Sequence, residues 1–279
     1  MDWWVWPVAL LAVTFAMGIV AVLAGVGGGV LFVPIIGAFF PFHLDFVRAA
    51  GLLLALTAAL SAAPSLLRSG LASVRLAMPL TVVSSITSIA GALLGLALPT
   101  GALQIALGLL ILAIAAVMWR SRASVHPQVA RADPLSMALG MHGMYHDAAL
   151  GRDVEWKVHR TAAGFVAFAG IGVVAGMFGL GAGWANVPAL NLLMGVPLKL
   201  AVGTSGFLLI GGATSAAWIY LERGAVLPML VVPSIIGVML GAKVGVRLLK
   251  AAKPAHVRQV VLILLVLAGA RALLKGFGI

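Results

Sequence analysis

The chain has 279 residues, of which 63% are hydrophobic and 9% are charged. Soluble domains carry roughly 45–50% apolar and about 25% charged residues, so this composition excludes a soluble globular fold. The net charge of +11 does not indicate a nucleic-acid binder, because the cations lie in short gaps between apolar runs and not on one water-facing surface. Cysteine is absent, which excludes disulfides and thiolate ligands.

Apolar stretches recur along the chain, and a bilayer core of about 30 Å accepts helices of about 20 apolar residues. The eight predicted spans are residues 3–24, 47–67, 76–98, 101–119, 161–178, 199–221, 225–242 and 257–274. The first is expected to be a retained helix with a tryptophan anchor, because it lacks the basic start of a signal peptide. Two shorter pieces, residues 30–40 and 184–194, each follow a glycine cluster. They are predicted to be half-helices, either re-entrant or steeply tilted.

The second half of the sequence repeats the first. Residues 25–34 (GVGGGVLFVP) align with residues 179–188 (GLGAGWANVP), and residues 62–70 align with residues 216–224. Glycines spaced four apart also correspond: Gly91 and Gly95 with Gly241 and Gly245. This spacing is typical of closely packed helices. Three blocks in the same order predict two transmembrane repeats, residues 1–120 and 160–279.

Lysine and arginine predict the orientation, because cytoplasmic loops retain an excess of both. They concentrate around the connecting loop, residues 121–159, and between residues 243 and 258, so we place both in the cytoplasm. The equivalent turns at residues 41–47 and 195–199 then fall on opposite faces, although Arg271 and Lys275 break the rule by falling outside. The expected fold class is an all-α, polytopic transmembrane helical bundle of two inverted repeats with glycine-broken or re-entrant half-helices, in the inner (plasma) membrane.

The connecting loop carries His142 and His146. A metal site there would need both histidines on one face of a helix, and Gly143 argues against a helix. We expect a folded turn or hairpin instead, and no metal or other cofactor.

All seven acidic residues and all six histidines lie in predicted loops or at the edges of spans. Proton relays, cation sites and catalytic centres in membranes usually need an ionisable group at depth. A cation pump and a membrane-embedded enzyme are therefore disfavoured. An anion needs no such group, because a helix N-terminus offers free N–H groups and the positive end of the helix dipole.

The glycine clusters are therefore the predicted substrate-binding elements. They comprise Gly25, Gly27, Gly28 and Gly29 in the first half and Gly179, Gly181 and Gly183 in the second. Glycine permits a break and leaves the N–H groups open to a ligand. Tight helix packing is the alternative role, but repetition at matched positions, each followed by Val-Pro, favours a site. Two breaks in inverted repeats would place two positive helix ends near the middle of the membrane.

Polar side chains in the spans are further candidates. Thr204 and Ser205 begin the span after the second half-helix, and Asn186 lies within that half-helix. Such hydroxyls more often bond a carbonyl of their own helix, and a buried amide needs a partner of some kind. Arg48 and Lys199 lie at the two mouths, where they either attract anions or anchor the topology.

Taken in order, these residues resemble the sulfite exporter TauE/SafE family of membrane permeases. The resemblance is carried by residues 25–34, 142–155, 179–191 and 194–199 and by Thr204-Ser205, and it covers nearly the whole chain. It implies a secondary transporter of sulfite, sulfoacetate or a related organosulfur anion, coupled to an ion gradient. The chain departs from the family pattern at Gly51, where a Thr-Ser pair could stand, at Gly206, often asparagine, and at Ala182, which replaces a glycine.

The expected function is therefore transport of a small oxyanion bound by backbone N–H groups at the two breaks. The expected partners are that anion and the lipid bilayer, with no nucleic acid; a homo-oligomer is left open. The alternative functions are a passive anion channel and a membrane scaffold that recruits a partner through the connecting loop.

Overall fold

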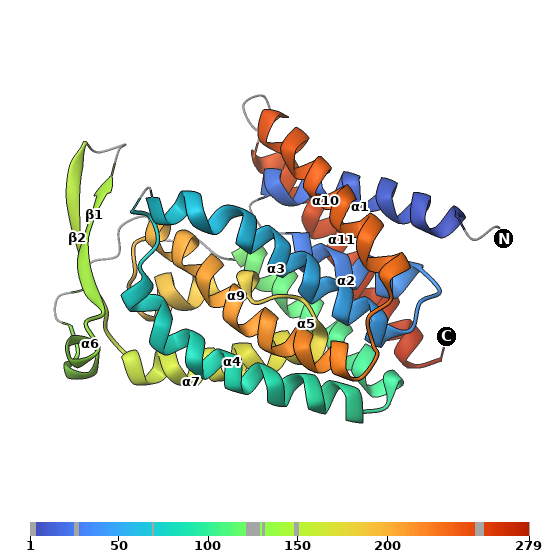
Figure 1. Ribbon diagram of the computed structural model, residues 1–279, viewed down its shortest axis with the longest axis horizontal. Coiled ribbons are helices and arrows are strands. Elements are labelled where there is room, and N and C mark those ends of the chain that lie inside the picture. Colours follow the sequence, from blue (N-terminus) through green and yellow to red (C-terminus); the bar gives the residue numbers. More distant parts are fainter. Residues whose placement is uncertain are drawn as a thin grey trace.

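The structure is a computed structural model that describes residues 4–24, 28–68, 70–120, 129, 132–147, 151–248 and 254–278. These residues are mostly helical, with one small two-stranded hairpin (Figure 1). The first half contains α1 (Val5–Ala24), α2 (Gly28–Phe39), α3 (Leu44–Arg68), α4 (Val74–Ala97) and α5 (Thr100–Arg120). The connecting segment contains α6 (Pro134–Ala138), β1 (His142–Asp147) and β2 (Arg152–Lys157). The second half contains α7 (Thr161–Phe178), α8 (Gly183–Pro188), the π-helix η1 (Ala189–Leu193), α9 (Leu198–Glu222), α10 (Pro228–Leu248) and α11 (Pro254–Gly276).

The predicted helical membrane protein is confirmed, and every predicted apolar stretch corresponds to a helix. Among the described residues, five helices are long and apolar enough to cross a membrane: α3, α4, α5, α7 and α9. Shorter apolar stretches lie in α1, α2 and α10. The two predicted half-helices are also separate elements, since α2 has 12 residues and α8 runs directly into η1.

Glycines let the long helices approach one another closely. Where α4 crosses α7, a Cβ added to Gly91 would collide with the α7 backbone, and one added to Gly95 would lie 2.8 Å from the Met177 carbonyl. Where α1 crosses α10, a Cβ on Gly241 would collide with the Phe15 carbonyl. Such close contact gains van der Waals energy where lipid supplies no hydrophobic drive. The predicted packing role of Gly91, Gly95 and Gly241 is confirmed.

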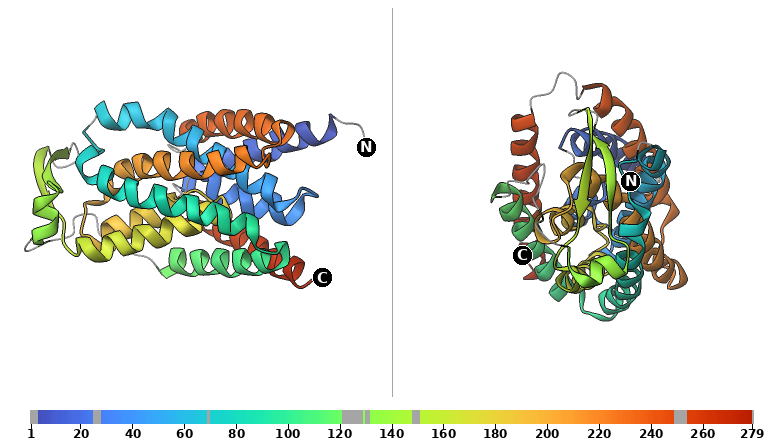
Figure 2. Two further views of the ribbon diagram at one scale, coloured as in Figure 1. Left: turned by 60° about the horizontal axis from the view of Figure 1, so that its bottom comes forward. Right: turned by 90° about the vertical axis from the view of Figure 1, so that its left-hand side faces the viewer.

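In each half, the first long helix is followed by a short helical segment that runs back beside it. Helix α2 returns beside the start of α1, where Trp6 lies edge-on to Phe40, with ring centroids 6.0 Å apart. Helices α8 and η1 return beside the start of α7, where the His159 N–H donates to the Met194 carbonyl at 3.2 Å. The two contacts lie at opposite ends of the bundle (Figure 2). The contact of His159 is at the end that carries the β-hairpin, and the contact of Trp6 is at the end where both chain termini lie. We call these the hairpin end and the far end.

The connecting segment forms the predicted hairpin from the two strands found in the described part of the chain. Strand β1 pairs antiparallel with β2, so that Tyr145 lies opposite Val154. Tyr145 and Trp156 are buried in one apolar cluster with Met194 and other residues at the hairpin end of α7 and α9. The hairpin is therefore packed onto the bundle.

Asp133 fastens this segment to α7. Its carboxylate accepts hydrogen bonds from the Ser136 N–H at 2.6 Å, the Thr161 N–H at 2.6 Å and the Thr161 hydroxyl at 3.0 Å. One side chain thus caps the N-termini of α6 and α7. Burial raises the pKa of Asp133, but these hydrogen bonds to its charged form prevail and hold the pKa below its ordinary value.

Lys275, which the charge rule left unexplained, has a structural role at the far end. Its ammonium group donates to the Gly37 carbonyl at 3.0 Å. That carbonyl belongs to the last turn of α2, where the helix dipole favours a cation.

Candidate functional site

The second glycine cluster interrupts the backbone between α7 and α8. Gly179 ends α7 in the left-handed conformation (φ 70°), and its N–H donates to the Ala175 carbonyl at 2.9 Å. Gly181 is also left-handed (φ 66°), which an L-residue with a side chain adopts only at a cost. Helix α8 then begins at Gly183, and no side chain caps it. The backbone hydrogen bonds of the described residues include none from the N–H groups of Gly181, Ala182 or Gly183.

The first cluster separates α1 from α2. Gly25 and Gly27 lie outside the described residues, and α2 begins at Gly28. A Cβ added to Gly29 would lie 3.1 Å from the Leu180 carbonyl. The start of α2 therefore touches the second break, although 151 positions separate Gly29 from Leu180 in the sequence (180 minus 29).

Ala55 of α3 lies between the two breaks. A Cβ on Gly29 would be 3.0 Å from the Ala55 Cβ, and a Cβ on Gly181 would be 2.9 Å from the same atom. Both distances are shorter than ordinary van der Waals contact between carbon atoms. Three small residues therefore allow α2, α3 and the α7–α8 break to meet at one place.

The crowding around Gly51, one turn earlier in α3, explains why this position carries no hydroxyl residue. A Cβ on Gly51 would collide with the Gly179 carbonyl and with the Val33 side chain. A threonine or serine at this position would not fit beside the break. The departure from the family pattern at Gly51 therefore has a steric reason.

The polar candidates of the second half are only partly brought together. The Asn186 Nδ2 lies 3.5 Å from the Ser205 carbonyl, and its buried Oδ1 has no hydrogen-bond partner among the described residues. Thr204 is also buried, but its hydroxyl accepts a hydrogen bond from the Ser73 N–H at 3.2 Å, towards the hairpin end. Leu209, one turn after Ser205, lies 3.6 Å from the Cβ that Gly181 would carry. Asn186, Ser205 and the second break are thus neighbours, whereas Thr204 holds the α3–α4 connection.

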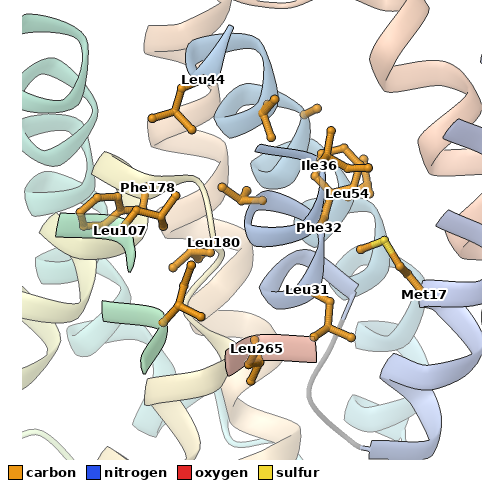
Figure 3. Close-up of a cluster of buried hydrophobic side chains, with 14 of the residues drawn as sticks. Met17, Leu31, Phe32, Ile36, Leu44, Leu54, Leu107, Phe178, Leu180 and Leu265 are labelled. Carbon is orange, nitrogen blue, oxygen red and sulfur yellow. The ribbon is translucent and has the colours of Figure 1, made fainter. Parts of the chain in front are cut away.

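Apolar side chains enclose the junction of the breaks. Leu180 projects into a cluster with Leu31 and Phe32 of α2 and with Phe178 and Leu107 (Figure 3). All five are buried. Two pockets of the described residues lie away from this junction, one of about 130 Å³ under the β-hairpin and one of about 630 Å³ between α5 and α11. Buried apolar side chains thus surround the place where the start of α2 meets the α7–α8 break.

Arg48 is the residue whose position the sequence analysis missed. It was placed at a mouth, but it is fully buried in α3, and its Nη1 donates to the Met177 carbonyl at 2.8 Å. Its Nη2 pairs with Asp45, and its guanidinium lies 5.5 Å from the centre of the Tyr220 ring. An Asp and an Arg spaced three apart at the start of an apolar helix were the signal, because a charge at such a position needs an internal partner.

Metal binding finds no support in the described residues, where no group of three or more histidine, cysteine, aspartate or glutamate side chains could hold an ion. His142 and His146 lie on a strand, so the helix face that a shared ligand pair would need is not formed.

Comparison with known proteins gives one curated relative and the family. A probable membrane transporter protein, YunE of Bacillus subtilis (strain 168), is 26% identical over 148 residues, which cover 53% of this chain and 54% of that protein. The match thus spans about half the length of either protein. No solved structure matches the chain. The profile described as sulfite exporter TauE/SafE matches residues 10–272, and the chain therefore belongs to this family of membrane transporters.

Proposed function

We propose that the chain is a secondary transporter of a small oxyanion, which binds where the two glycine breaks meet on either side of Ala55. That meeting is the observation that carries the proposal, because it brings together the start of α2 and the α7–α8 break, which belong to different halves of the sequence. The substrate class is sulfite, sulfoacetate or a related organosulfur anion, in keeping with the family.

Backbone N–H groups are the proposed ligands. The N–H groups of Gly181, Ala182 and Gly183 donate no backbone hydrogen bond among the described residues, and they lie at the start of the 11 consecutive helical residues of α8 and η1. Helix dipoles place partial positive charge at such a terminus. Gly28 and Gly29 begin α2, and we propose their N–H groups as the ligands from the first half. The amide of Asn186, beside Ser205, is the proposed side-chain contact.

The helix pairing supports two inverted repeats as the basis of alternating access. Helix α1 packs along α10, and its proposed counterpart α7 packs along α4, which is the proposed counterpart of α10. The two returning half-helices also enter from opposite ends. We propose residues 1–120 and 160–279 as the repeats, joined by residues 121–159 in the cytoplasm, so that the hairpin end faces inward in the plasma membrane.

Burial of Leu180, Leu31 and Phe32 beside the junction favours a carrier over an open channel. A carrier must close over its substrate, and apolar side chains between two half-helices can separate when the repeats rock against each other. In a channel the same side chains would block conduction.

Exchange in proteoliposomes tests this function. Vesicles preloaded with unlabelled sulfite should take up labelled sulfite faster than empty vesicles. The reason is that a carrier with sulfite bound returns to its outward-facing state faster than an empty carrier does. A channel or a scaffold gives no such acceleration. Equal uptake by loaded and empty vesicles would overturn the proposal.

A further inference from the structure

Arg48 brings a positive charge to the place where three helices end. Its Nη1 donates to the Met177 carbonyl, one residue before the end of α7. It also lies against Gly95, near the end of α4, whose added Cβ would be 2.6 Å from Nη1, and against Tyr220, near the end of α9. Helix C-termini carry partial negative charge, so the carbonyls here attract the guanidinium.

The guanidinium is incompletely satisfied. Arginine has five N–H donors, and its Nε and Nη2 form a parallel fork that matches two oxygens of one oxyanion. Asp45 binds Nη2 through a single oxygen, Oδ1, whereas the buried Nε has no partner among the described residues. The fork is therefore only half filled.

Solvent reaches the pair from the far end. The Asp45 side chain is 27% exposed, and His43, whose Nδ1 lies 3.3 Å from Asp45 Oδ2, is 54% exposed. On the other side, Arg48 adjoins the second break, because a Cβ on Gly179 would lie 2.5 Å from the Arg48 Cα. Arg48 thus stands between the far-end surface and the proposed substrate site.

We propose that Arg48 is an anion-docking residue on this route, and that Asp45 occupies it as an internal substitute for the transported oxyanion. A carboxylate and sulfite share the chemistry that a guanidinium fork recognises: negative charge on oxygens held a fixed distance apart. An arriving oxyanion fills both positions of the fork, releases Asp45 towards solvent and then moves on to the N–H groups of the break. This inference rests on the proposed function, since it gives that substrate its entry or exit point.

The experiment compares Asp45→Asn, Arg48→Gln and the double variant with the unaltered protein. Sulfite is titrated while the thermal unfolding of the purified protein is followed, because a ligand that binds the folded form raises its apparent stability. Asp45→Asn should bind sulfite at least about tenfold more tightly, the lower end of what a hydrogen bond to a charged group contributes. Arg48→Gln should bind it more weakly, and the double variant should lose the gain.

Glu222→Gln is the matched control, because it removes one exposed negative charge from the same end of the bundle and should leave sulfite affinity unchanged. A purely structural ion pair predicts the opposite for Asp45→Asn, namely lower stability and no gain in affinity, and that result overturns the inference. If Arg48→Gln fails to fold, the double variant, which removes both charges of the pair, takes its place: it should lack the gain in sulfite affinity that Asp45→Asn shows. Because binding is measured separately from flux, absence of sulfite transport by the unaltered protein would contradict the proposed function, while unchanged affinity in Asp45→Asn contradicts only the role of Arg48.

Discussion

Gly181→Ala and Gly224→Ala form a matched pair that isolates the junction of the breaks. Both glycines are left-handed with φ of 66°, so alanine at either position incurs the same backbone cost of roughly 1–2 kcal/mol. Only Gly181 adds a collision, because its new Cβ would lie 2.9 Å from the Ala55 Cβ, whereas nothing lies within 4 Å at Gly224. Overpacking of this kind costs a further ~1–3 kcal/mol or moves the backbone.

We therefore expect Gly181→Ala to lose most sulfite transport and Gly224→Ala to keep it. A shift of the break that weakens binding by about 1.4 kcal/mol would reduce affinity about tenfold. Both purified variants are compared by thermal unfolding in detergent and by initial uptake into proteoliposomes.

Ala55→Gly supplies the rescue, since it removes the methyl group that the new Cβ meets. The double variant Gly181→Ala with Ala55→Gly should recover part of the lost transport, and Ala55→Gly alone should remain active. Equal flux in Gly181→Ala and Gly224→Ala, or no recovery in the double variant, would refute the reasoning.

Two further variants probe other contacts. Asn186→Leu should lower sulfite affinity in the same titration, because it removes the Nδ2 donor that the anion would accept from. Thermal stability should be kept, because that donor has only a long 3.5 Å contact and the buried Oδ1 has no described partner; a large loss of stability would assign Asn186 a structural role instead. Asp133→Asn should lower stability at neutral pH, because it weakens the caps on α6 and α7. The folded-state pKa of Asp133 is lowered, so its contribution is present above the unfolded value near 3.9 and is lost as the pH falls through the folded pKa. Unfolding temperatures measured against pH should therefore converge for the two proteins below about pH 4, and a constant difference would contradict the cap.

The helices and breaks could be predicted because their causes are local. An apolar run of bilayer length predicts a span, as in α7, whose bounds match the predicted 161–178. Gly179 and Gly181 predict a break, because their backbone angles suit glycine. Residues 184–194 were similarly recognised as a short helix from the cluster before them and their limited length.

The meeting of the breaks could not be predicted, because it depends on packing between distant segments. Nothing in the sequence near Ala55 distinguishes it from the other alanines of α3. Thr204 was chosen for its neighbourhood to the breaks, but its hydroxyl accepts from Ser73 across the α3–α4 connection. The sequence alone places Arg48 at a mouth, whereas the ends of α4, α7 and α9 enclose it in the structure.

The most direct test of the central claim is the position of a bound oxyanion. Selenite has the shape and charge of sulfite and scatters anomalously, so crystals grown with it would locate the anion without reference to the protein density. We expect an anomalous peak within hydrogen-bond distance of the N–H groups of Gly181 to Gly183, facing the start of α2. A peak that lies only elsewhere, for example in the pocket under the β-hairpin, in a protein that transports selenite, would contradict it.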